Sequence, residues 1–261
     1  MTAPQPTATP ARPPTGSTGS TRSADGSDDA EGEKPSHWRR LAPPVALAAL
    51  LLVWSNVVLP ALPADAILKA LFNVGGVAAM VTVARLLGLT WADLGIGRGT
   101  WGAGLRWGGA AIGVAVLGYG AVLIVAPQLL ENPQLAGASP GALLLRGLLL
   151  IPLGTVLAEE LAFRGVLHGR SVRSLPVRAA LGVSAVAFGL WHLTVALGPS
   201  AVPLPPTLQW TSALAVLAVT ITGGLALGWL RHRTGSVLAP IGLHLGTNAV
   251  GIVAAGVALA H

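Results

Sequence analysis

The chain has 261 residues, of which 52% are hydrophobic and only 10% are charged, and its mean hydropathy is +0.68. Soluble domains are about one quarter charged, so this composition excludes an ordinary soluble protein and indicates an integral membrane protein. The 16 Lys and Arg exceed the 10 Asp and Glu, but they are spread over short loops and form no basic face that would predict nucleic-acid binding. Without cysteine the chain forms no disulfide, Cys-ligated zinc site or thiol nucleophile, and it cannot itself be prenylated.

Residues 1–36 are rich in Pro, Thr, Ser, Gly and Asp and contain almost no large apolar side chains. Such a segment cannot bury enough surface to offset the entropy of ordering, so we expect a disordered tail. It lacks the short apolar core of a secretory signal, and the first apolar run begins only after Arg39 and Arg40. We therefore predict a retained cytoplasmic tail, followed by a transmembrane domain over 37–261.

Seven later segments are long enough to span about 30 Å of hydrocarbon at about 1.5 Å per residue. They predict an all-α, polytopic transmembrane helix bundle of about seven spans, and the pattern is compatible with six to eight. The segments lie near 41–62, 66–88, 106–128, 141–167, 179–198, 208–230 and 236–260.

Lys and Arg collect in alternate connections, as the positive-inside rule requires. They precede the first segment and surround the second, fourth and sixth connections, whereas the other connections hold little positive charge. This pattern predicts a multi-pass protein of the cell membrane with its N-terminus in the cytoplasm. The arginines concerned are Arg39, Arg40, Arg85, Arg98, Arg106, Arg170, Arg173, Arg178, Arg231 and Arg233.

Two adjacent carboxylates, Glu159 and Glu160, lie in the fourth apolar segment. A charge at bilayer depth costs a few kcal/mol or more, so such groups usually mark function. On a helix Glu160 and Arg164 share a face at i and i+4, and Arg164 can neutralise Glu160. Glu159 remains the less neutralised carboxylate and is a candidate general base. The alternative is a structural ion pair near the interface, but that interpretation leaves Glu159 without a partner.

Two further pairs stand one helical turn apart. Phe188 and His192 share a face in the fifth segment, and His244 and Asn248 share one in the seventh. A single buried histidine is as often structural as functional. Counting about 1.5 Å per residue from the predicted cytoplasmic ends puts Glu159 about 12 Å deep, His192 about 20 Å, and His244 and Asn248 about 12 and 18 Å. We therefore expect these side chains to meet. Glycines on the sixth and seventh segments, Gly224, Gly228, Gly242 and Gly246, are expected to permit close helix packing.

The ordered set Glu159-Glu160-x-x-x-Arg164, Phe188-x-x-x-His192 and His244-x-x-x-Asn248 resembles the CPBP family of intramembrane proteases. That family includes the type 2 CAAX prenyl endopeptidases and the bacteriocin-processing or self-immunity proteins. The resemblance covers about 141–250, which it marks as the catalytic core; the first three segments carry no matching motif.

The resemblance implies an endopeptidase with five catalytic residues and two supporting residues. Glu159 and His192 would activate the attacking water, and His244 and Asn248 would stabilise the oxyanion. Glu160, also in the catalytic set, would be held by Arg164, with Phe188 orienting the site. No cofactor is favoured. Zn²⁺ stays open, because Glu159, His192 and His244 could ligate it, although the chain lacks His-Glu-x-x-His.

The function predicted is hydrolysis of a peptide bond in a membrane-associated or lipidated protein or peptide by a glutamate-activated water. One alternative is a non-proteolytic membrane interaction or immunity protein on the same scaffold. Another is an ion-coupled transporter, since buried Glu, His and Asn also suit an ion path. The expected partners are the substrate and the lipid bilayer, with no nucleic acid; the sequence determines neither the substrate nor the oligomeric state.

Overall fold

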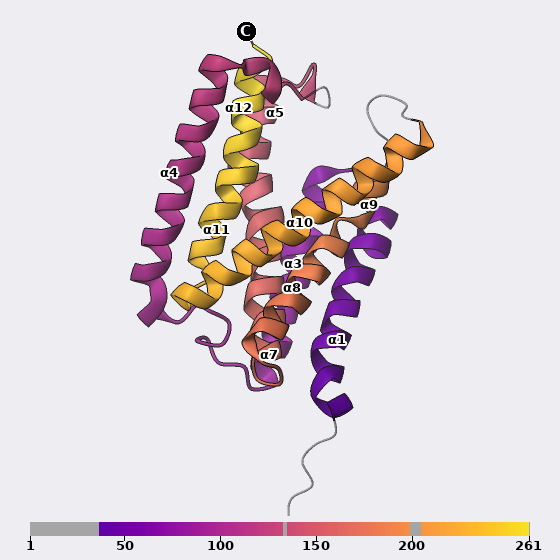
Figure 1. Cartoon of the computed structure of the whole chain (residues 1–261), viewed down its shortest axis with the longest axis vertical. Coiled ribbons are helices and arrows are strands. Elements are labelled where there is room, and N and C mark those ends of the chain that lie inside the picture. Colours follow the sequence, from indigo (N-terminus) through magenta and orange to yellow (C-terminus); the bar gives the residue numbers. More distant parts are fainter. Residues whose placement is uncertain (1–36, 133–134, 199–204, 261) are drawn as a thin grey trace, which may run out of the picture. The chain divides into compact units, whose positions relative to one another are not determined.

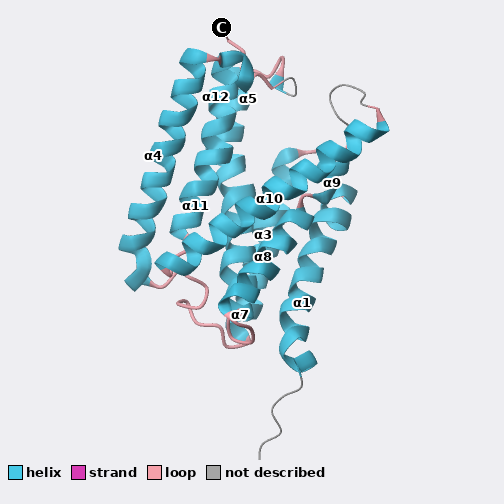
Figure 2. Cartoon of the chain, in the orientation of Figure 1, coloured by secondary structure: helices cyan, strands magenta, loops and turns pink. Residues whose placement is uncertain are grey.

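Helices make up all the regular structure in the described part of the chain (Figures 1 and 2). The computed structural model describes residues 37–132, 135–198 and 205–260, so the tail predicted at 1–36 lies outside the described residues. The all-α prediction is confirmed. In chain order the elements are α1 (His37–Val53), η1 (Trp54–Val58), α2 (Leu59–Ala61), α3 (Ala66–Leu86), η2 (Arg98–Thr100), α4 (Trp101–Val125), η3 (Pro127–Leu130), α5 (Pro140–Leu145), η5 (Arg146–Leu157), α6 (Ala158–Glu160), η6 (Leu161–Leu167), α7 (His168–Ser171), α8 (Val177–Trp191), α9 (Leu193–Leu197), α10 (Pro206–Thr234), α11 (Leu238–Leu245), η7 (Gly246–Val250) and α12 (Gly251–Ala258).

Six helical segments within the described ranges are long enough and apolar enough to cross a membrane, which confirms the polytopic architecture. They are Trp38–Ala61, Ala66–Leu86, Arg98–Val125, Pro140–Ser171, Pro206–Thr234 and Leu238–Ala258. Each matches a predicted segment. The remaining one, 179–198, forms α8 and α9, and α8 has only 15 residues. The count is therefore six, inside the predicted range of six to eight.

The fifth predicted segment is interrupted at His192. The backbone N–H of His192 bonds the Gly189 carbonyl, and its φ and ψ of −91° and 11° end α8. Backbone groups freed by such a break need other partners at membrane depth. Asn56 of η1 supplies them: its Nδ2 donates to the Leu190 carbonyl at 3.1 Å, and its Oδ1 accepts from Thr194 N at 3.1 Å. One amide from the first span thus holds both sides of the break.

The segment Pro140–Ser171, which carries the glutamates, alternates between ordinary and wider turns. Its parts η5 and η6 are π-helical, and the short α6 with both glutamates lies between them. Pro152 lies within η5. A proline inside a helix removes one backbone donor and clashes with the carbonyl four residues earlier, and wide turns of this kind often accompany functional sites.

Small residues bring several helices into direct backbone contact. α11 lies against α4 (Figure 1), where a Cβ on Gly242 would collide with the backbone of Gly108. α10 packs on α8, where a Cβ on Gly224 would lie 3.0 Å from the Cα of Ala185. Helix association in lipid depends on close van der Waals contact. The packing role predicted for these glycines is therefore confirmed.

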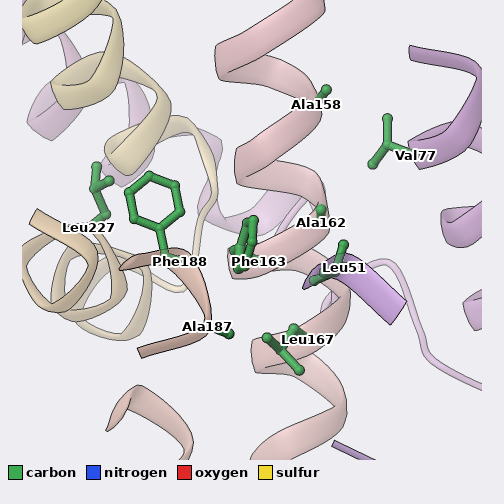
Figure 3. Close-up of a cluster of buried hydrophobic side chains, with 9 residues drawn as sticks. All are labelled: Leu51, Val77, Ala158, Ala162, Phe163, Leu167, Ala187, Phe188 and Leu227. Carbon is green, nitrogen blue, oxygen red and sulfur yellow. The ribbon is translucent and has the colours of Figure 1, made fainter. Parts of the chain in front are cut away.

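The apolar core surrounds the glutamate segment (Figure 3). Phe163 of η6 and Phe188 of α8 are buried and meet edge to face at 5.2 Å between ring centroids. Residues from α1, α3, α6, η6, α8 and α10 complete the cluster: Leu51, Val77, Ala158, Ala162, Leu167, Ala187 and Leu227. The aromatic pair lies one turn beyond Glu159 and Glu160, so it forms the apolar side of their surroundings.

The loop between α3 and η2 is fastened to the bundle by charged groups. Asp93 Oδ2 accepts hydrogen bonds from Thr90 N and Thr90 Oγ1, each 2.6 Å, and pairs with Arg173 at 2.7 Å. Arg231 of α10 donates to the Asp93 carbonyl at 2.8 Å. Burial raises the pKa of Asp93, but the hydrogen bonds from Thr90 and the charge of Arg173 outweigh it, and the pKa lies below its usual value of 3.8.

Candidate active site

The two glutamates occupy different surroundings, although they are adjacent in α6. Glu160 is 0% exposed, and its Oε1 lies 2.9 Å from Arg164 Nη1 and 2.8 Å from His244 Nδ1. The i, i+4 pair expected from the sequence is therefore present. Because one oxygen of Glu160 receives both a guanidinium and an imidazole N–H, this carboxylate is the more neutralised of the two.

Arg164 is entirely buried and contacts three groups. Besides Glu160, it donates from Nη2 to the Gly224 carbonyl at 3.3 Å. Its Cζ lies 4.1 Å from the centroid of the Phe188 ring, a cation–π contact that is strongest away from water. The guanidinium thus links α6, α8 and α10. The ring of Phe188 is the apolar surface against this guanidinium, and the orienting role predicted for it stays a prediction.

Glu159 is 4% exposed and makes one hydrogen bond. Its Oε1 accepts from the indole Nε1 of Trp191 at 3.1 Å, while its Oε2 is buried and accepts from no described residue. His244 Nε2 lies 3.9 Å from Oε2. A buried carboxylate oxygen without a donor is costly, and it is free to accept a proton or a hydrogen bond from a bound molecule.

His244 connects the glutamates with Asn248. Its Nδ1 faces Glu160 at 2.8 Å, and its Nε2 lies 3.1 Å from the Asn248 amide nitrogen. The proton on Nδ1 is assigned from the carboxylate partner, and Nε2 of the neutral ring then accepts from the amide. Asn248 lies in η7 with an exposed side chain. The predicted pair on the seventh segment is thus joined to the glutamates.

His192 is half-buried and joins the cluster through Phe188. Its Nδ1 lies 2.8 Å from the Phe188 carbonyl, and the two rings meet at 4.9 Å. The ring of Phe188 also lies 5.8 Å from that of His244, so it stands between the histidines. His192 forms no hydrogen bond with Glu159. The expected direct meeting of these two side chains is therefore replaced by contacts through Phe188 and the neighbouring Trp191.

A cavity of about 510 Å³ opens beside Glu159. Glu159 and Trp191 line it, whereas His192, His244 and Asn248 do not. Glu159 therefore lies at a junction, with the cavity on one side and the His244–Asn248 pair on the other. Most of the other lining residues come from α1, α3 and the segment that carries the glutamates; α1 and α3 are two of the three spans in which the sequence showed no motif.

Trp191 and Asn56 are polar groups of the site that sequence reasoning did not assign. Trp191 supplies the hydrogen bond to Glu159, and Asn56 holds the break beside His192. A signal was present for both. An indole N–H or an amide inside an apolar span needs a hydrogen-bond partner, and each lies in a segment with few other polar groups.

The predicted metal ligands do not assemble as a metal site. Across the described ranges, no three His, Cys, Asp or Glu side chains are grouped so that they could hold a metal ion. Nδ1 of His192 and Nδ1 of His244 each face an oxygen acceptor, and Nε2 of His244 faces the Asn248 amide. Binding of Zn²⁺ by Glu159, His192 and His244 therefore stays a prediction.

Comparison with known proteins supports the family resemblance. Residues 140–250 match the family model described as type II CAAX prenyl endopeptidase Rce1-like. No curated protein and no solved structure matches the chain. The matched range runs from the start of α5 through η7 and includes every predicted catalytic residue, from Glu159 to Asn248. Over residues 140–250 the chain is therefore similar to the type II CAAX prenyl endopeptidase Rce1-like family, which agrees with the resemblance read from its three motifs.

Proposed function

We propose that the protein is an intramembrane endopeptidase that uses Glu159 to activate water against a peptide bond of a membrane-associated or lipidated substrate. The observation that carries the proposal is the buried Oε2 of Glu159, which has no donor among the described residues and belongs to a residue that lines the cavity. The match of residues 140–250 to the protease family model supports the reaction class, and the six apolar spans support the membrane location. The loop arginines favour a cytoplasmic N-terminus in the cell membrane.

The first chemical step is attack of water on the substrate carbonyl carbon. Glu159 Oε2 takes one proton from the water as the C–O bond forms, while the indole of Trp191 fixes the other carboxylate oxygen. His192 donates Nδ1–H to the Phe188 carbonyl, so Nε2 of its neutral ring carries a lone pair that can accept the second water hydrogen. Glu159 then returns its proton to the leaving amine as the C–N bond breaks.

The negative charge on the carbonyl oxygen needs hydrogen-bond donors. The Asn248 amide provides N–H groups, and His244 holds that amide 3.1 Å from its Nε2. When the His244 ring carries two protons, Nε2–H becomes a second donor, and Glu160 at 2.8 Å compensates the ring charge. Arg164 keeps Glu160 in place. The catalytic roles inferred from the family resemblance are therefore compatible with the contacts of these side chains.

The test compares Glu159→Gln with wild-type protein, first in cell membranes and then as purified protein in liposomes. The substitution keeps the size of the side chain and an acceptor for Trp191, so the fold should persist, while loss of the base lowers the cleavage rate about 100- to 10,000-fold. Quantitative proteomics of membranes identifies precursors that accumulate in the variant. Purified protein in liposomes then measures their cleavage, with chelator added in parallel. Glu131→Gln, in an exposed loop, is the matched control.

Unchanged processing by folded Glu159→Gln would overturn the proposal. A cellular phenotype that survives both Glu159→Gln and His192→Ala would favour a non-proteolytic interaction or immunity protein. Solute flux into liposomes that depends on Glu159, without cleavage, would favour an ion-coupled transporter.

A further inference from the structure

The cavity beside Glu159 is a groove along three helical segments, called here the α1–α3 groove. Its floor is one face of the glutamate segment, because the lining residues there recur every four positions. That face comprises Ala158, Ala162, Val166 and Arg170. α1 with η1 forms one wall and α3 with the following loop forms the other, chiefly through Pro43, Leu47, Leu51, Trp54, Val77, Met80, Ala84 and Leu89.

One end of the α1–α3 groove is fixed by neutral hydrogen bonds. Trp54 Nε1 donates to Asn73 Oδ1 at 3.0 Å, and Asn73 Nδ2 donates to the Gly154 carbonyl at 3.0 Å. These bonds tie α1 and α3 to the glutamate segment five residues before Glu159. Glu159 therefore lies near the end that carries these hydrogen bonds, and the lining residues continue from it toward Arg170, on the predicted cytoplasmic side.

Only two residues that line the groove are charged, Glu159 and Arg170. Arg170 is half-buried and donates from Nη1 to the Ser174 hydroxyl at 2.7 Å. Among the described residues, the arginines in ion pairs are Arg164 and Arg173, and Arg170 pairs with no carboxylate. A guanidinium presents five N–H donors in a fork that matches a carboxylate, so Arg170 keeps most of its binding capacity at the far end of an apolar groove.

The separation of Glu159 and Arg170 determines how many substrate residues fit between them. They are eleven positions apart on one helical segment, which corresponds to roughly 16 Å at about 1.5 Å per residue. An extended peptide advances about 3.3–3.6 Å per residue. The distance from Glu159 to Arg170 is thus covered by four or five residues of extended substrate, whose side chains would contact apolar walls.

We propose that Arg170 is a specificity-determining residue that binds a substrate carboxylate and sets cleavage four or five residues away from it. The inference rests on the proposed function and deepens it. The carboxylate is either the C-terminal carboxylate of the substrate or an Asp or Glu side chain. The intervening residues are apolar, because the groove offers them no polar partner between its two ends.

The experiment first maps bonds whose cleavage depends on Glu159, by profiling new peptide termini in membranes from wild-type and Glu159→Gln cells. Peptides covering these bonds are then synthesised with a free C-terminal carboxylate or a C-terminal amide, and with each acidic side chain kept or neutralised. Full-length wild type, Arg170→Gln, Arg170→Lys and Arg173→Gln are assayed in liposomes. Arg173→Gln is the matched control, since Arg173 pairs with Asp93 and does not line the groove.

We expect a carboxylate four or five residues from each mapped bond. Neutralising it should raise KM about tenfold or more for wild type, the effect of one charge-assisted hydrogen bond, with little change in kcat. Arg170→Gln should raise KM equally for the acidic peptide and no further for the neutral one, while Arg170→Lys restores part of the loss. Comparison of the amide and neutralised-side-chain peptides identifies the source of the carboxylate.

Equal KM values for acidic and neutral peptides in wild type would overturn the inference. So would native mass spectrometry that finds a phospholipid retained by wild type and lost from Arg170→Gln, because Arg170 would then hold a lipid phosphate. If Glu159→Gln changes no termini, the proposed function itself fails. If Glu159→Gln abolishes cleavage and Arg170→Gln leaves KM unchanged, only the role of Arg170 fails.

Discussion

The structure contains two arginine–carboxylate pairs of similar length. One lies inside the helix bundle, and the other involves the loop between α3 and η2. Arg164 and Glu160 are 2.9 Å apart with both side chains 0% exposed, whereas Arg173 and Asp93 are 2.7 Å apart with side chains 38% and 26% exposed. The exposed carboxylate gathers three donors on one oxygen. The buried cluster instead keeps Glu159 Oε2, Glu160 Oε2 and Arg164 Nε without partners.

The two pairs differ in role. The exposed pair attaches a loop to the bundle, whereas the buried pair belongs to the cluster that is proposed to carry out the reaction. Water can solvate the polar atoms that the exposed pair leaves unpaired. That pair therefore contributes little to the free energy of unfolding, and its unpaired atoms cost little. The buried cluster has no such compensation, so its unpaired atoms are retained at an energetic cost. Of the three residues concerned, Glu159 lines the cavity. An unpartnered buried acceptor is what a general base requires before its substrate arrives.

The largest expected effect comes from removing the buried cation. Arg164→Met should destabilise the protein by about 3–5 kcal/mol, because Glu160 is left as an uncompensated buried charge. Retention of folded protein in detergent during heating measures the loss. The double variant Arg164→Met with Glu160→Gln should recover part of that stability without recovering proteolysis. If Arg164→Met is as stable as wild type, the buried pair is not structural.

A smaller effect is expected from removing the neutral partner of Glu159. Trp191→Phe keeps an aromatic ring near Phe163 but deletes the indole donor, and loss of one hydrogen bond to a charged group is worth about 1.5–3 kcal/mol. We expect kcat to fall about tenfold or more while the unfolding temperature changes little. Trp210→Phe, an exposed indole on α10, is the control. An unaltered kcat would show that Trp191 does not orient the base.

The smallest effect belongs to the exposed pair. Asp93→Asn should lower the free energy of unfolding by less than about 1 kcal/mol. The folded-state pKa of Asp93 lies below its usual value of 3.8, so its charge stabilises the protein above that value and the contribution disappears as pH falls through the folded-state pKa. Stability measured from pH 7 downward should therefore differ between wild type and variant at neutral pH and converge in acid. A constant difference would contradict this assignment.

The side-chain pairs that the sequence could predict are those between residues about one helical turn apart. The Glu160–Arg164 pair, the Phe188–His192 ring contact and the His244–Asn248 pair each lie within one helical turn, so helical periodicity determines them before any packing is known. Hydrophobic length predicts all six spans of the described residues, but it also predicts a seventh at 179–198, where the structure has the shorter α8 and then α9. The family resemblance rests on the same three local patterns.

The features that the sequence could not predict depend on contacts between spans that are far apart in the chain. The link from Asn56 to the helix break at His192 joins positions more than 130 residues apart, and no local pattern announces it. The α1–α3 groove is equally hidden, because an apolar side chain that faces a cavity looks the same in sequence as one that faces lipid. The hydrogen bond from Trp191 to Glu159 depends on how α8 turns against α6, which only packing decides.

The Asn56 amide has a consequence for how substrate binding and chemistry are coupled. The same helix that walls the groove through Leu47 and Leu51 continues into the turn that carries Asn56, and this amide holds the backbone on both sides of His192. A movement of α1 that widens the groove would therefore also displace the backbone beside His192. Two uncharged hydrogen bonds thus connect a wall of the groove to the histidine proposed to take part in the reaction.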